Sequence, residues 1–203
     1  QLPIYNDLVN KKESPTPNVW PSKLPNLQPA LYEVGNQIRE VSLMLYDCID
    51  AHINKLLPGY NLTFKDIVKQ SNHNVGRLLH YFERGNNKIS KDDNWCGWHN
   101  DHGALTGLVS ALFFNKKGQL VNDSIKLEKS GLWIQSRKGE YFKVSYGKND
   151  IAYQIGETYQ ILSGGRLYAT PHAVIIDEDC PSDVHRSTFA LFMEPEMNFK
   201  LNI

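Results

Sequence analysis

The chain has 203 residues, of which 41% are hydrophobic and 11% aromatic, a composition typical of one globular domain with a buried core. Its 22 Lys and Arg balance its 22 Asp and Glu, which argues against nucleic acid or an anionic membrane as the partner. The three cysteines form no CxxC pair and no apolar run is long enough to cross a membrane, so we expect a reducing, cytoplasmic location.

Six prolines fall within residues 1–29, a density that excludes a regular helix or a central strand. We expect an irregular arm there, anchored by apolar side chains such as Trp20 and Leu24. A long helix is predicted over residues 30–57, where apolar residues recur at alternating three- and four-residue steps. The predicted buried stripe of this helix consists of Leu31, Val34, Ile38, Val41, Leu45, Cys48, His52 and Leu56.

After the long helix, Thr63 and Asp66 resemble a capping box, which predicts a short helix from about Phe64 to Gln70. From residue 75 onward, short runs rich in Val, Ile, Phe and Tyr alternate with turn-forming clusters, a pattern typical of short antiparallel strands. These runs are residues 77–82, 104–114, 132–135, 141–145, 151–155, 172–176 and 188–193. The predicted fold is therefore mainly β with flanking helices, a sandwich or barrel of antiparallel sheets.

The segment that points to chemistry is the H-x-D triplet of His99 and Asp101. Residues two apart in a strand point to the same side, so this imidazole and carboxylate can converge on one divalent metal. A histidine from a distant strand would complete the facial triad of non-haem Fe(II) oxygenases, whereas structural zinc sites have four protein ligands. His172 is the best candidate because it opens an apolar strand, while His102 would point away from Asp101 and His185 lies in a polar stretch.

Arg186 and Thr188 share one face of the last predicted strand. A guanidinium with a hydroxyl two residues on can bind a carboxylate, and an arginine inside an apolar barrel is costly without an anionic partner. A structural ion pair between Arg186 and Asp183 is the alternative interpretation.

These motifs resemble those of the isopenicillin N synthase-like branch of the Fe(II)/2-oxoglutarate-dependent dioxygenases. The family pattern H-T-D-x-G-x-L-T matches residues 99–106, with Asn100 in place of Thr. Its R-L-N-Y-Y-P strand resembles residues 77–82, its I-G-D turn resembles residues 155–157, and its R-x-S motif appears at residues 186–188 with Thr for Ser. The family's run up to its second metal-binding histidine resembles residues 164–174, so the motifs occur in the family's order.

The resemblance implies a double-stranded β-helix (jelly-roll) core over residues 73–195, helical support over 30–72 and a Pro-rich arm over 1–29, together forming one oxygenase domain over 1–203. It implies Fe(II) held by His99, Asp101 and His172, and 2-oxoglutarate held by Arg186 and Thr188. Tyr81 matches a cosubstrate-binding tyrosine of the family, although a strand tyrosine is equally often only packed.

The activity implied is hydroxylation or desaturation of a small-molecule substrate with dioxygen, releasing succinate and CO2. Some members of this branch use no 2-oxoglutarate: in isopenicillin N synthase the R-x-S pair holds a substrate carboxylate, and an ethylene-forming relative uses ascorbate. A 2-oxoglutarate-independent Fe(II) oxidase and a non-catalytic β-barrel binding module therefore stay open as alternatives. Neither the substrate nor the oligomeric state can be read from the sequence.

Overall fold

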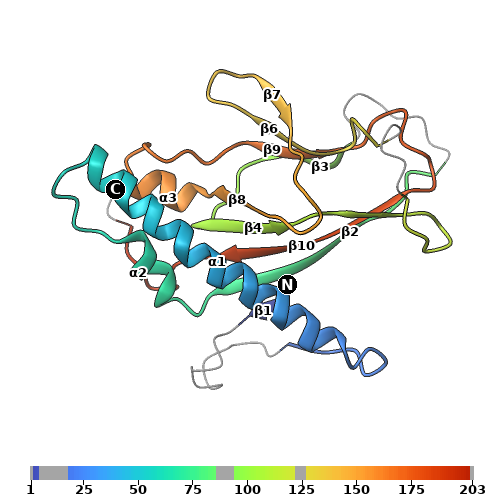
Figure 1. Cartoon of the computed structure of the whole chain (residues 1–203), viewed down its shortest axis with the longest axis horizontal. Helices are drawn as coiled ribbons and strands as arrows, with labels where there is room; N and C mark the ends of the chain where they lie inside the picture. Colours follow the sequence, from blue (N-terminus) through green and yellow to red (C-terminus); the bar gives the residue numbers. More distant parts are fainter. Residues whose placement is uncertain (1, 5–17, 86–93, 122–126, 202–203) are drawn as a thin grey trace.

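The computed structural model describes residues 2–4, 18–85, 94–121 and 127–201, which form two antiparallel sheets flanked by helices (Figure 1). The larger sheet has the strand order β1-β2-β10-β4-β8, with β5 also paired to β10, and the smaller sheet has the order β3-β9-β6-β7. The strands are β1 (Leu2–Ile4), β2 (Asn74–Tyr81), β3 (Asn94–His99), β4 (Leu105–Val109), β5 (Leu112–Phe114), β6 (Gly131–Gln135), β7 (Tyr141–Lys143), β8 (Ile151–Ile155), β9 (His172–Ile175) and β10 (His185–Met193). The predicted jelly-roll fold class is thereby confirmed.

The alternation of β10 determines which residues face the interior of the barrel. Phe189, Leu191 and Met193 are buried in the core between the larger sheet and the helices. Residues of the opposite parity on β10, Arg186 and Thr188 among them, therefore face the smaller sheet. The same holds for β2 and β4, which pair with β10. Each of their residues faces the same side, helices or barrel, as the β10 residue with which it pairs.

The helix α1 (Leu27–Leu56) packs against the larger sheet (Figure 1), through a face that only partly matches the predicted one: Leu31 and Ile38 are buried as predicted, and Val34 and Leu45 are partly buried. Its buried residues are Leu31, Gly35, Ile38, Ser42, Tyr46, Ile49 and Ile53. Val41, Cys48, His52 and Leu56 of the predicted stripe are instead exposed. The true stripe includes two small residues because α1 approaches the sheet closely: a Cβ on Gly107 of β4 would lie 2.2 Å from Cγ2 of Ile38.

The short helix α2 (Phe64–Lys69) lies where it was predicted, but the proposed capping box is wrong. Thr63 makes no side-chain capping hydrogen bond. The carboxylate of Asp50, on α1, instead accepts hydrogen bonds from the backbone N–H groups of Phe64 (2.7 Å) and Lys65 (3.1 Å). The cap is therefore supplied by another helix, which also fixes α2 to α1.

The N-terminal residues depart from the predicted arm in two places. β1 pairs with β2 at the edge of the larger sheet, a position where the proline at residue 3 is tolerated. α1 begins at Leu27, so Pro29 lies in its first turn, where no N–H is needed for the helix. Trp20 packs against the core as expected, whereas Leu24 is exposed; residues 5–17 of the predicted arm lie outside the described residues.

The third helix, α3 (Glu157–Leu162), follows β8 and was not predicted. Among the described residues, no helix is both long enough and apolar enough to cross a membrane.

Candidate metal centre

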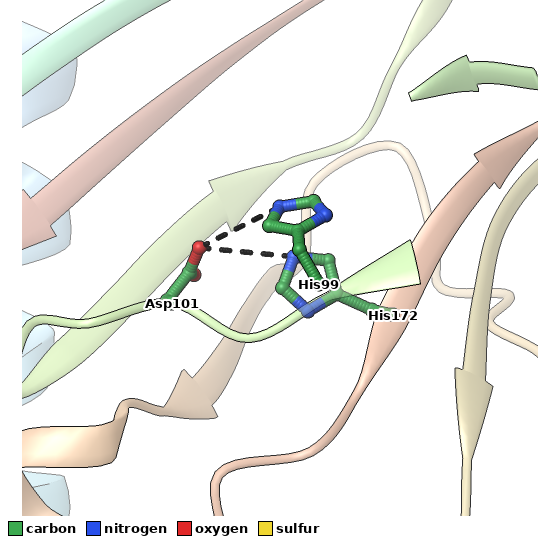
Figure 2. Close-up of side chains that lie close together, drawn as sticks. All are labelled: His99, Asp101 and His172. Carbon is green, nitrogen blue, oxygen red and sulfur yellow. Dashed lines mark ion pairs between the residues drawn. The ribbon is translucent and has the colours of Figure 1, made fainter. Parts of the chain in front are cut away.

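The side chains of His99, Asp101 and His172 converge at one end of the barrel (Figure 2). His99 is the last residue of β3, His172 is the first of β9, and the two are paired in register. Asp101 follows in the loop between β3 and β4. One ligand atom from each residue lies within 4.8 Å of the other two, and both imidazole Nε2 atoms approach the same carboxylate oxygen, Oδ1 of Asp101, at 4.0 and 3.7 Å.

Backbone carbonyls orient both imidazoles. Nδ1 of His99 lies 2.7 Å from the Gly97 carbonyl oxygen, and Nδ1 of His172 lies 3.1 Å from that of Thr170. A carbonyl only accepts, so each Nδ1 carries the proton and each Nε2 keeps a lone pair. Burial lowers the pKa of His172, which favours the neutral form that binds metals.

The Asp101 carboxylate is held by two side chains of the larger sheet. Its Oδ2 accepts hydrogen bonds from the Thr106 hydroxyl, at 2.6 Å, and from the side-chain amide of Gln154. Thr106 on β4 and Gln154 on β8 are directly paired across the two strands. These two bonds occupy Oδ2 and leave Oδ1 facing the two imidazoles, the orientation that a monodentate metal ligand requires.

Gln154 also supports the triad, although it was not predicted as a site residue. Its Nε2 also lies 3.2 Å from Nε2 of His172, so one amide contacts two members of the triad. The available signal was a polar side chain on the barrel face of an otherwise apolar strand. His102, in contrast, is exposed and binds Glu157, so it lies apart from the triad as predicted.

The loop that carries Asp101 rests on the start of α3. The N–H of Gly156 donates to the Ala104 carbonyl at 3.0 Å, and the N–H of Glu157 donates to the Asp101 carbonyl at 2.7 Å. A Cβ on Gly156 would lie 2.0 Å from the carbonyl oxygen of Gly103, so no side chain fits at this contact. The H-x-D-x-G and I-G-E segments are therefore packed directly against each other.

Arg186 is buried in the barrel beside Tyr81, with its Cζ 5.3 Å from the centre of the tyrosine ring. Its Nε and Nη1 are buried without a hydrogen-bond partner among the described residues. Burial lowers the pKa of Arg186, and the nearby Tyr81 and Tyr146 oppose that shift. No ion pair with Asp183 forms, so a guanidinium with two unpartnered nitrogens lines a cavity of about 520 Å³ whose lining also includes Phe113.

The Thr188 side chain is buried on the same face as Arg186, as the strand alternation predicted. Its hydroxyl donates to the Val109 carbonyl at 2.9 Å. The metal-site residues do not line the cavity beside Arg186. The described residues therefore contain two separate features on the barrel interior, a set of three metal-type ligands and an arginine with two unpartnered nitrogens.

No protein-family model matches the chain, and no curated protein sequence matches it. Its fold is similar to that of a full-length Neurospora crassa protein solved in complex with alpha-KG (2-oxoglutarate): the TM-score is 0.67 at 21% identity over 92% of this chain and 53% of that one. It is also similar to JOX2, solved with 2OG, Fe and JA (TM-score 0.62, 20% identity, 90% of this chain and 46% of that one).

A third similar structure is the dioxygenase for auxin oxidation 1 from Arabidopsis thaliana in complex with 2-oxoglutarate, with a TM-score of 0.60 and 20% identity over 87% of this chain and 56% of that one. The chain thus spans about half the length of these solved proteins. Together with the sheet order and the position of the triad, the likeness shows that this chain has the double-stranded β-helix fold of the Fe(II)/2-oxoglutarate-dependent oxygenases.

Proposed function

We propose that this protein is a non-haem Fe(II)/2-oxoglutarate-dependent oxygenase that hydroxylates or desaturates a small molecule. The observation that carries the proposal is the convergence of His99, Asp101 and His172. In each of them one side-chain atom is hydrogen-bonded to a neighbouring group and the other polar atom points toward the other two residues. Two neutral imidazoles and one carboxylate suit Fe(II) and leave open positions for other ligands. The similar structures solved with 2-oxoglutarate support the same assignment.

Arg186 is proposed to bind the distal carboxylate of 2-oxoglutarate. Two of its nitrogens, Nε and Nη1, are buried without a partner, so a carboxylate would offset a desolvation cost that the described residues leave uncompensated. Tyr81 packs against the guanidinium and limits its rotamers, which preorganises the site. Thr188 would join this contact after its hydroxyl releases the Val109 carbonyl.

The chain's own groups have distinct parts in this proposal. When bound, Fe(II) and 2-oxoglutarate supply the oxidation, coupling dioxygen to the release of succinate and CO2. Thr106 and Gln154 keep Asp101 monodentate, and the carbonyls of Gly97 and Thr170 keep the imidazoles in the metal-binding tautomer.

Anaerobic titration with Fe(II) and then 2-oxoglutarate tests the proposal. The expected result is a weak visible charge-transfer band that appears only after both are added, with succinate formed once air is admitted. His99→Ala and Asp101→Ala should each abolish the band, and the matched control His102→Ala should retain it. A band that survives loss of His99 or Asp101 would refute the metal assignment.

The same titration separates cosubstrate use from metal binding. Arg186→Gln should weaken 2-oxoglutarate binding by about a hundredfold, the cost of a lost charge-assisted contact, while Fe(II) affinity is unchanged. Dioxygen consumption that needs Fe(II) and a substrate but not 2-oxoglutarate would instead indicate an oxidase of the same fold.

A further inference from the structure

Arg77 is a second arginine on the barrel side of the larger sheet. On β2, Tyr81 pairs with Arg186 and contacts its guanidinium inside the barrel. Arg77 precedes Tyr81 by four residues on the same strand, so it points to the same side. Its guanidinium lies over the ring of Phe192, with Cζ 4.5 Å from the ring centre.

The register places Phe192, the ring under Arg77, in the row that leads to the metal centre, while Arg77 itself pairs with Ala190 two residues away along β10. Phe192 is paired with Thr106, and Thr106 is paired with Gln154. Thr106 and Gln154 both bind the Asp101 carboxylate. Directly paired residues of neighbouring strands share a face, and each step across the sheet is about 4.8 Å. The aromatic platform under Arg77 is thus two strands from Gln154, on the face that carries the triad.

The guanidinium of Arg77 is positioned by an aromatic ring. Its Nε is buried without a hydrogen-bond partner among the described residues. Four other arginines each donate to at least one backbone carbonyl; these are Arg39, Arg84, Arg137 and Arg166. The arrangement of Arg77 resembles that of Arg186: an aromatic ring lies against each cation, and the Nε of each is buried without a hydrogen-bond partner among the described residues.

Both sheets contribute an aromatic side chain to the barrel side. Phe192 provides one aromatic face. On the smaller sheet, His172 pairs with Ile134 and Ile134 pairs with Phe142, so Phe142 also faces the barrel, where its side chain is 49% exposed. A half-exposed aromatic residue beside a metal-binding row favours a ligand with an apolar body.

We propose that Arg77 binds the carboxylate of the substrate, and that the substrate is a small monocarboxylic acid with an apolar or aromatic body. This inference rests on the proposed function, in which the deeper Arg186 binds 2-oxoglutarate. Arg77 is half-buried and lies beside the row of paired residues that leads to Asp101. It is therefore more accessible than Arg186 to the substrate, which would bind after 2-oxoglutarate. A guanidinium stacked on an aromatic ring presents its remaining N–H groups edge-on, the geometry that a carboxylate accepts.

Isothermal titration with phenylacetate, benzoate and hexanoate, each compared with its uncharged amide, tests this site. At least one acid should bind the protein loaded with Mn(II) and 2-oxoglutarate, and its amide should bind about tenfold more weakly. Arg77→Gln should remove this preference for the acid, Arg77→Lys should keep part of it, and the control Arg166→Gln should keep it all. The 2-oxoglutarate affinity of Arg77→Gln should match that of the wild type.

The proposal is overturned if no acid binds the wild type, if Arg77→Gln binds acid and amide as the wild type does, or if Arg77→Gln loses 2-oxoglutarate instead of the acid. Thermal unfolding of each variant checks that it is folded, and Arg77→Lys decides the question if Arg77→Gln is not. Repeating the titration on metal-free protein separates the two proposals: acid binding through Arg77 without any Fe(II) or 2-oxoglutarate binding would refute the proposed function alone.

Discussion

Replacing Gly156 with alanine is expected to displace the loop that carries Asp101. The backbone of Gly156, with φ −97° and ψ 170°, is open to any L-residue, so only the surrounding atoms exclude a side chain. The added Cβ would lie 2.0 Å from the Gly103 carbonyl oxygen and 3.1 Å from that of Asp101. Ordinary contact begins at 3.4 Å, so the loop and the start of α3 must separate by about 1.4 Å.

That separation has two measurable costs. Overpacking against backbone atoms destabilises a protein by about 1–3 kcal/mol, which lowers the Tm by about 2–12 °C for a chain of this size. The shift also moves Asp101 relative to the two imidazoles, so Fe(II) or Co(II) should bind about ten- to a hundredfold more weakly, as when an outer support of a metal ligand is lost. Thermal unfolding measures the first effect, and Co(II) titration by visible absorption measures the second.

Gly97→Ala is the matched control for Gly156→Ala. Gly97 also adjoins the metal ligands, but a Cβ there would meet no atom within 4 Å. It should leave the Tm and the Co(II) affinity close to those of the wild type. If Gly156→Ala and Gly97→Ala behave alike in both measurements, the direct packing of α3 on the metal loop does not position Asp101, and the reasoning fails.

Three further changes probe the supports of the site. Gln154→Leu removes one of the two hydrogen bonds to Asp101, so metal affinity should fall about ten- to a hundredfold in the same Co(II) titration; unchanged affinity would mean that Thr106 alone suffices. Asp50→Ala removes the cap of α2 and should lower the free energy of unfolding in urea by about 0.5–2 kcal/mol without altering metal affinity. His102→Ala changes an exposed side chain and should shift the free energy of unfolding by less than about 0.5 kcal/mol; a larger shift or a weaker metal site would show that its bond to Glu157 supports the loop.

Most of the strands and the triad could be predicted from the sequence because their signals are local, whereas β1 and β3 lie outside the predicted strand runs. Alternating apolar runs mark strands wherever one face is buried, and an H-x-D triplet specifies its own geometry when it ends a strand. His172 was selected by its position at a strand entrance and by the order of the family's motifs, and the structure brings it to His99 and Asp101. The metal itself, and the partners of Arg186 and Tyr81, stay predictions that the titrations above test.

The missed features depend on contacts between distant segments. The buried face of α1 includes Gly35 and Ser42, which a search for apolar residues passes over, because the helix needs small residues where it approaches the sheet. The cap of α2 comes from Asp50, on another helix, and no local motif announces it. Gln154 is not a metal ligand, and only the pairing of β4 with β8 shows that it contacts Asp101.

The origin of the three metal-type ligands has a mechanical consequence for the barrel. His99 and His172 belong to the smaller sheet, whereas Asp101 is tied through Thr106 and Gln154 to the larger one. An ion bound by all three would link the two sheets to each other. Part of its binding free energy would then be used to hold the sheets at a fixed distance. Substitutions that change the distance between the two sheets should therefore change the metal affinity, even where they lie far from the ligands.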